Sequence, residues 1–101
     1  MRVLFMGTPD FAVYSLEALC SSRHEVIGVV TQPDRPGNRG VTVFSAVKKY
    51  ALANGLPVYQ FEKIRKDGVD VLRSLGADVF VTAAYGQILS REIIELPRYG
   101  I

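Results

Sequence analysis

Short unbroken apolar runs alternate along the chain with longer segments whose apolar residues recur every three or four positions. Residues 3–6 are wholly apolar and end at Gly7, and comparable runs lie within 25–31 and 79–83. Such runs are typical of strands buried on both faces, whereas the longer spacing is typical of amphipathic helices. We predict strands at 3–6, 25–31, 56–59 and 79–83, and helices at 9–20, 46–54, 69–75 and 91–96.

Residues with strong positional preferences mark the ends of these helices. Thr8 suits the N-cap of the first helix, with Pro9 at its first helical position, and Ser45 and Ser90 suit the N-caps of the second and fourth. Glycines follow the second and third helices, where a left-handed residue commonly ends a helix: Gly55 and Gly76. Pro97 stops the last helix.

Strands that alternate with helices predict an α/β fold, a Rossmann-like doubly wound parallel sheet. The expected strand order is 56–59, 25–31, 3–6, 79–83, and Gly100–Ile101 should approach a further strand. Ligands of such sheets bind beyond the carboxyl ends of the strands, where the strand order reverses. The loops at 7–11, 32–40 and 84–89 therefore become candidate sites. Segment 32–40 is dense in turn residues, so we expect no regular structure there.

Composition limits the class of protein. The 101 residues are 49% hydrophobic and 22% charged, which is typical of a globular domain, and no apolar run is long enough to cross a bilayer. The single cysteine, Cys20, allows no internal disulfide and suits a cytoplasmic protein; its helical setting favours packing over nucleophilic chemistry.

The formal net charge is only +2, yet residues 35–66 hold seven Lys and Arg against one acidic residue, a local net charge of +6. This stretch is either a solvated basic face or a surface that meets a polyanion.

The loops carry few catalytic groups. Loop 7–11 has one glycine where a dinucleotide fingerprint needs three, Pro9 removes an N–H, and Asp10 would repel a pyrophosphate. Asp34 alone matches that fingerprint, so nicotinamide-cofactor binding is disfavoured. Loop 84–89 suits a flat heteroaromatic ring, or it is an ordinary strand–helix connection. The only histidine, His24, lies at the opposite edge of the predicted sheet, and no metal-ligand spacing occurs.

Taken together, four motifs in order resemble the opening of the methionyl-tRNA formyltransferase family. They are Phe5-Met6-Gly7-Thr8-Pro9-Asp10-Phe11-Ala12, Gly28-Val29-Val30-Thr31-Gln32-Pro33-Asp34-Arg35-Pro36, Ala84-Tyr85-Gly86-Gln87-Ile88-Leu89 and Leu96-Pro97-Arg98-Tyr99-Gly100. The resemblance implies transfer of a formyl group from 10-formyltetrahydrofolate to the methionine of initiator tRNA during translation initiation, without a metal. Residues 1–101 would form the amino-terminal portion of the formyltransferase catalytic domain.

The resemblance also assigns binding residues. The pterin ring would contact the loop that follows residues 79–83: Tyr85, Gly86, Gln87, Ile88 and Leu89. The methionyl end of the tRNA would lie near Thr8, Pro9, Asp10 and Phe11. Arg35 and Arg39 would contact phosphates or the acceptor end, with Lys48 and Lys49 as longer-range support. Fewer lysines follow Gly40 than is usual in the family, which should weaken the attraction to phosphate.

In the family, the catalytic asparagine, histidine and aspartate lie beyond the point that matches Ile101, as does a carboxy-terminal tRNA-binding domain. We therefore expect a truncated chain that does not turn over alone and that self-associates through the open edge of strand 79–83. Two alternatives stay open. One is another folate-dependent formyltransferase, acting on a sugar amine or glycinamide ribonucleotide, and the other is a non-catalytic folate- or RNA-binding module.

Overall fold

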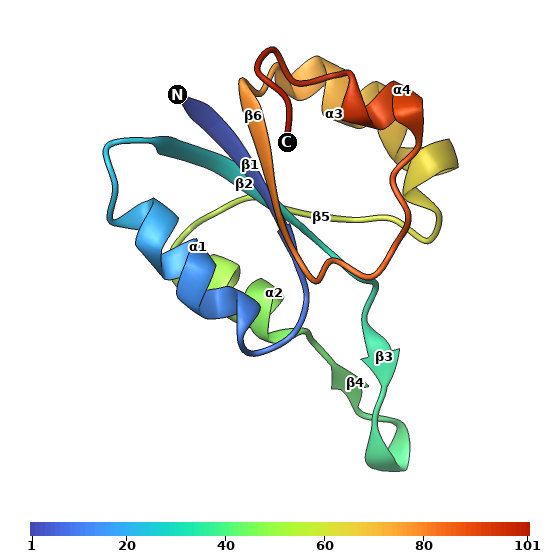
Figure 1. The fold of residues 1–101 in the computed structure, drawn as a ribbon. Coiled ribbons are helices and arrows are strands. Elements are labelled where there is room, and N and C mark those ends of the chain that lie inside the picture. Colours follow the sequence, from blue (N-terminus) through green and yellow to red (C-terminus); the bar gives the residue numbers. More distant parts are fainter.

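Four parallel strands form the centre of the molecule in the computed structural model, which describes residues 1–101 apart from the side chain of Asn38. The sheet order is β5-β2-β1-β6, and all three pairings are parallel (Figure 1). The strands are β1 Arg2–Gly7, β2 Glu25–Thr31, β5 Val58–Gln60 and β6 Val79–Ala83. The predicted strand order is confirmed.

Helices cover both faces of this sheet. The first face is covered by α1 (Ala12–Cys20) and α2 (Ala46–Ala53). The other face carries a π-helical turn, η2 (Ile64–Gly68), together with α3 (Val69–Leu75) and α4 (Arg91–Ile94) (Figure 1). The fold is therefore the doubly wound α/β architecture that the sequence predicts.

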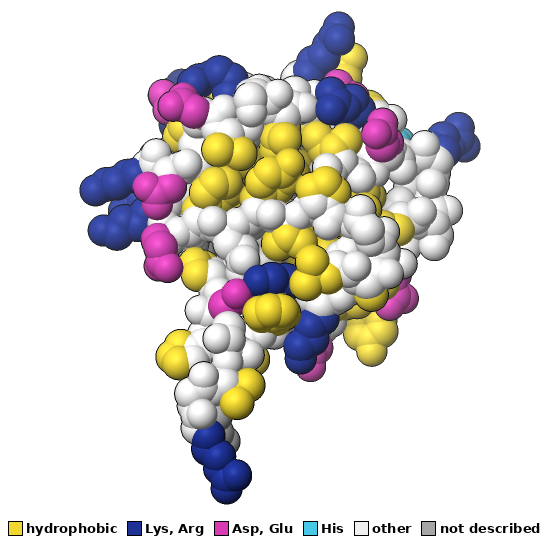
Figure 2. Space-filling model, turned by 180° about the vertical axis from the view of Figure 1, so that it is seen from behind, with side chains coloured by type: hydrophobic (Ala, Val, Ile, Leu, Met, Phe, Trp, Pro, Cys, Tyr) yellow, Lys and Arg dark blue, Asp and Glu magenta, His cyan; other side chains and the backbone are white. Residues whose placement is uncertain are grey.

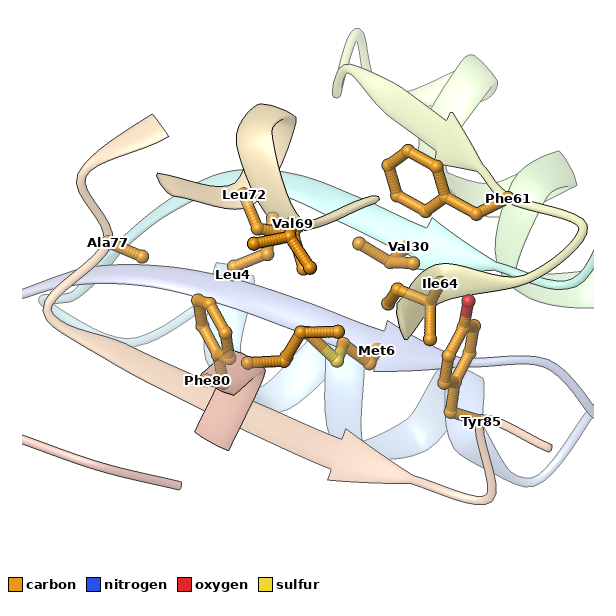
Figure 3. Packing of buried hydrophobic residues seen from close by; sticks show 11 residues of the cluster. Leu4, Met6, Val30, Phe61, Ile64, Val69, Leu72, Ala77, Phe80 and Tyr85 are labelled. Atoms are coloured by element: carbon orange, nitrogen blue, oxygen red, sulfur yellow. The ribbon is translucent and has the colours of Figure 1, made fainter. Parts of the chain in front are cut away.

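Strand β1 contributes side chains to two separate hydrophobic clusters, because successive side chains of a strand point to opposite faces of the sheet. Phe5 packs with the α1 and α2 residues Leu16, Val47 and Ala51. Leu4 and Met6 point the other way, into a cluster with residues of η2, α3, β6 and α4 (Figure 3). That cluster includes Ile64, Leu72, Phe80 and Ile93, each no more than 1% exposed. Both faces of β1 are buried, as its unbroken apolar run predicts.

A narrow two-stranded arm projects from the carboxyl edge of the sheet between β2 and α2 (Figures 1 and 2). Its strands β3 (Arg35–Pro36) and β4 (Thr42–Val43) pair antiparallel, and the 3-10 turn η1 (Asn38–Gly40) forms its tip. The prediction of no regular structure in 32–40 was wrong at residues 35–36. Pro36 is tolerated because a two-stranded ribbon leaves one backbone side of each strand facing solvent, where no donor is needed.

Three of the four helix starts were placed correctly. The hydroxyl of Ser45 accepts from Lys48 N at 3.1 Å, and that of Ser90 accepts from Ile93 N at 3.3 Å. The third helix, α3, begins at Val69 as expected. Thr8 is not an N-cap: α1 begins at Ala12, because Thr8 turns its hydroxyl to the main chain of the β6 loop instead.

Two details at helix ends also differ from expectation. Helix α4 ends at Ile94 rather than near residue 96. Cys20 is exposed at the end of α1, so the expectation that it packs in the core was wrong. It occupies the last turn of α1, and the cluster beneath that helix takes its buried side chains from Ala12 and Leu16.

The last residues of the chain bond to the amino end of β6, and the structure assigns no strand to Gly100–Ile101, where the sequence led us to expect the approach to one. Tyr99 N donates to Asp78 O at 2.8 Å, and Phe80 N donates to Gly100 O at 3.1 Å. Among the described helices, none combines the length and the apolar character needed to span a bilayer.

We expect Ser45→Ala to destabilise the fold more than the matched cap variant Ser90→Ala. Ser45 caps α2 and also shares a 2.7 Å hydrogen bond with the hydroxyl of Thr31, which is fully buried. Losing the cap and leaving the Thr31 hydroxyl unpaired should lower the free energy of unfolding by about 2 kcal/mol, against about 1 kcal/mol for Ser90→Ala. Urea denaturation measures both, and equal losses would contradict the added role of Ser45.

Candidate functional site

The three loops at the carboxyl edge of the sheet are held together by the hydroxyl of Thr8. Thr8 Oγ1 donates to the carbonyl of Tyr85, in the β6 loop, at 2.7 Å. The same oxygen lies 3.4 Å from the N–H of Gln32, at the start of the β2 loop. One short side chain in the β1 loop therefore ties both neighbouring loops.

Gln87 makes a second junction between loops. Its Nε2 donates to the carbonyl of Phe61 at 2.6 Å and to Gln32 Oε1 at 2.8 Å. Its Oε1 accepts from Ile64 N at 2.7 Å. Because a backbone N–H can only donate and a carbonyl can only accept, these two main-chain partners decide which way the Gln87 amide faces. Gln32 must then present its oxygen.

The β6 loop has an unusual backbone. Ala84 has φ 53° and Gly86 has φ 101°, so a residue with a β-carbon occupies the left-handed region beside a glycine that needs it. A β-carbon at position 86 would meet Gln32 Nε2 at 2.6 Å. The loop is thus strained at Ala84, and the Gln32 amide lies against Gly86.

The segment Gly86–Leu89 offers main-chain groups to a ligand. Within the described part of the chain, none of its N–H or C=O groups forms a hydrogen bond. Ile88 is 81% exposed, whereas Leu89 is partly buried against the cluster beneath α3 and α4. Unpaired main-chain groups beside an exposed aliphatic side chain can bind the edge and the face of a flat polar ring.

Tyr85 points away from this surface. Its side chain is 4% exposed and lies among Met6 and Ile64 in the core (Figure 3). Burial raises the pKa of its hydroxyl to about 12. The hydroxyl has no hydrogen-bond partner among the described residues. Tyr85 therefore anchors the loop through its ring, and only its main chain faces the neighbouring loops.

Lys48 contacts both roots of the arm and so acts as a clamp, the first root being residues 32–34 between β2 and β3 and the second residues 44–45 between β4 and α2. On the first root, its Nζ lies 2.8 Å and 3.0 Å from the two carboxylate oxygens of Asp34. On the second root, it lies 3.8 Å from the centre of the Phe44 ring, a cation–π distance. Gln60 joins this group by accepting from Lys48 Nζ at 3.1 Å. Figure 2 shows acidic, basic and apolar side chains meeting where the arm joins the body.

The ionised form of Asp34 is favoured by these contacts. The hydrogen bond from Lys48 lowers the pKa of Asp34 below its ordinary value of 3.8, and a hydrogen bond from Gln60 Nε2 at 2.8 Å lowers it further. The same Gln60 amide donates to the carbonyl of Gln32 at 3.1 Å. The Asp34 carboxylate is thus bound by Lys48 and Gln60 of the same chain. These contacts explain why an acidic residue follows β2, and binding to a nucleotide ribose is not needed to explain it.

A shallow cavity of about 230 Å³ opens beside the β6 loop, lined by Glu62, Lys63, Arg65, Gln87 and Ile88. Among the described residues, no group of three or more His, Cys, Asp or Glu side chains is placed to hold a metal ion. His24 lies at the amino edge of the sheet, with its Nδ1 3.2 Å from the amino-terminal nitrogen of Met1. It is therefore remote from the three loops, as the sequence predicts.

A family-wide comparison matches residues 1–101 to the formyl transferase family. The chain belongs to that family. It is 51% identical to a methionyl-tRNA formyltransferase of Agathobacter rectalis over 99% of its own length, and 52% identical to that of Alkaliphilus metalliredigens over 99%. It is also 51% identical to that of Thiobacillus denitrificans over 99%. The chain spans about a third of the length of these curated relatives, 33%, 32% and 33% respectively.

Some of the binding residues expected for a formyl transferase domain are exposed, and others are held in contacts within the chain. Phe11 is 62% exposed, and Asp10, Arg35, Arg39 and Lys49 are also exposed. Lys48 differs, because its side chain is only 13% exposed and its charge is balanced by Asp34. The clamp places Lys48 at the root of the arm, while Arg39 lies at the tip with φ 59°.

Sequence reasoning missed the role of three polar side chains that connect the loops of this domain: Gln32, Asp34 and Gln60. Each lies at or just after the carboxyl end of a strand, which was the available signal. The spacing along the chain gave no information on which of them would bond to which, because their partners are 12 to 55 positions away.

We expect Lys48→Met to raise the pKa of Asp34, because it removes the strongest contact that favours the carboxylate. A lowered pKa means that the clamp stabilises the fold fully above the unfolded-state pKa, about 4, and loses this contribution as the pH falls through the folded-state pKa. The titration of the Asp34 carboxyl carbon by NMR measures this. Lys49→Met, one residue along α2, should leave the titration unchanged, and an unchanged Asp34 pKa in Lys48→Met would refute the clamp.

Proposed function

We propose that the protein transfers the formyl group of 10-formyltetrahydrofolate to the amino group of methionine on initiator tRNA, in the cytoplasm, during translation initiation. The observation that carries the proposal is identity at about half of all positions, 51% and 52%, with methionyl-tRNA formyltransferases over 99% of this chain.

The β6 loop supports a folate donor. The pterin ring is flat, with donors and acceptors along its edge, and the unpaired main-chain groups of Gly86–Leu89 match that chemistry. The exposed side chain of Ile88 would lie against the face of the ring, while Leu89 and Tyr85 hold the loop to the core. Gln87 contributes by fixing the loop to Phe61 and Ile64.

The arm supports a tRNA acceptor. Arg35, in β3, and Arg39, in η1, are both exposed on the arm, which projects from the body of the fold where a large ligand can reach it (Figure 2). Its exposed apolar residues are Val41, Val43 and Phe44. Phe11, on the β1 loop, would meet the methionyl end, since Thr8 brings that loop against the folate-side loop. Lys48 orients the arm, and Lys49 adds charge at its base.

Residues 1–101 would supply binding and orientation rather than the proton-transferring groups of the reaction. The attack of a neutral amine on a formyl carbonyl needs a group that accepts a proton and donors for the developing oxyanion. The one histidine is at the wrong edge of the sheet, and Asp34 is held as a carboxylate by Lys48. The catalytic groups would therefore belong to chain beyond these residues, as would a tRNA-binding domain.

We expect the intact gene product to formylate methionyl-initiator-tRNA, and Arg35→Ala and Arg39→Ala to weaken tRNA binding through lost phosphate contacts. Each variant should lower the magnitude of the salt slope of log Kd by about one, because one fewer counterion is released. Filter binding across a salt series measures the slope. Arg73→Ala is the matched control, since Arg73 pairs with Asp70 on α3 at 3.0 Å, away from the arm.

The choice of acceptor tests the function itself. Equal or faster transfer to a sugar amine or to glycinamide ribonucleotide than to methionyl-tRNA would overturn the proposal in favour of another folate-dependent formyltransferase. Binding of folate and tRNA without any transfer by the intact gene product would indicate a non-catalytic binding module.

A polypeptide of residues 1–101 produced alone should show no turnover and should self-associate. Strand β6 is an edge of the sheet, and only its amino end is bonded to Tyr99 and Gly100. An open edge pairs readily with another chain. Light scattering should detect dimers or larger species, and Thr82→Lys, a charge at an exposed position of β6, should reduce them. Formyl transfer by this polypeptide, or a monodisperse monomer at high concentration, would contradict these two expectations.

A further inference from the structure

A continuous chain of polar contacts connects the β6 loop to the root of the arm. Gln87 donates to Gln32 Oε1 at 2.8 Å, and the carbonyl of Gln32 accepts from Gln60 Nε2 at 3.1 Å. Gln60 Nε2 also donates to Asp34 Oδ1 at 2.8 Å, and Asp34 pairs with Lys48 at 2.8 Å. Five residues from four segments therefore form one network between the two proposed binding surfaces, in which Gln32 contributes both its side-chain oxygen and its main-chain carbonyl.

Every link in this network is short and at least partly shielded from water. The bonds of Gln32, Gln60 and Gln87 are all part-buried. Hydrogen bonds shielded from solvent are stronger than exposed ones, and breaking one leaves a polar group without a partner. A change in the position of the β6 loop therefore acts on Gln32 through the Gln87–Gln32 bond.

The β6 loop is also placed to respond to a ligand. It is strained at Ala84 with φ 53°, and Gly86 lies directly beneath the Gln32 amide. A ring that contacts the main chain of Gly86–Leu89 would contact the segment whose first residue, Gly86, lies against the Gln32 amide. A shift of the Gln32 side chain acts on the Gln32 main chain, which belongs to the first root of the arm.

We propose that Gln32 is a positioning residue that couples occupancy of the β6 loop by the folate donor to the orientation of the arm, and so to tRNA affinity. The proposal rests on the function proposed above and extends it, because it makes binding of the two substrates cooperative. Linkage requires that the coupling is reciprocal: if folate tightens tRNA binding by some factor, tRNA tightens folate binding by the same factor.

The Gln32–Gln87 bond is the link that can be removed with least damage. Gln87 keeps its bonds to Phe61 and Ile64 when Gln32 is changed, so the β6 loop stays attached to the core. Gln32→Met removes the acceptor at similar length. Gln32→Glu keeps an oxygen that can accept from Gln87 Nε2, so it is the conservative variant expected to rescue the coupling.

The test measures the Kd of initiator tRNA for the intact gene product, by fluorescence anisotropy, with and without saturating tetrahydrofolate. This folate has no formyl group to transfer, so only binding is observed. We expect folate to lower the tRNA Kd by about five-fold or more in the unaltered protein, the lower end of typical coupling. The ratio should fall to about one in Gln32→Met, and Gln32→Glu should restore it. Because the coupling is a ratio, a uniform change in tRNA affinity cancels.

Thr42→Val, on the arm and outside the network, is the matched control and should keep the full ratio. An unchanged ratio in Gln32→Met, or a ratio of one in the unaltered protein with both ligands bound, would overturn the coupling and leave the proposed function standing. Failure to bind either ligand would overturn the proposed function and the coupling with it.

Discussion

Strand β1 has no face that meets solvent, and this constraint organises the rest of the domain. Leu4 and Met6 fill one cluster and Phe5 the other, so helices must cover both sides of the sheet. Strands in such a sheet run parallel, which brings all their carboxyl ends to one edge. The polar residues that follow β1, β2, β5 and β6 consequently converge, and the candidate site is the direct result of burying both faces of one strand.

The edge so formed is held by side chains rather than by further secondary structure. Thr8 and Gln87 join the loops, while Lys48 joins the two roots of the arm through Asp34 and Phe44. Because Lys48 is used in these internal contacts, only part of the positive charge in residues 35–66 stays exposed. Lys48 is compensated inside the fold, whereas Arg35 and Arg39 stay exposed on the arm.

The fold was largely predictable because local signals agreed with it. Unbroken apolar runs predicted β1, β2 and β6, and Ser45, Ser90 and Gly76 marked helix ends correctly. Thr8 shows where that reasoning fails: its sequence context is that of an N-cap, yet a carbonyl 77 positions away competes for its hydroxyl. The prediction of no regular structure at Arg35–Pro36 failed for a related reason. A composition rich in turn residues does not reveal a partner strand six or more residues later.

By itself, the sequence determined the doubly wound sheet, its strand order and the three loops at the carboxyl edge that form the candidate site, because burial periodicity and strand–helix alternation are local properties. The tertiary structure alone decided what the polar residues in those loops do. It pairs Lys48, which the sequence suggested only as longer-range support for tRNA binding, with Asp34. It also buries the ring of Tyr85 and makes Gln32 the link between the β6 loop and the arm. Hydrogen-bond partners of a side chain depend on which distant backbone groups the fold leaves unpaired, and spacing along the chain does not contain that information.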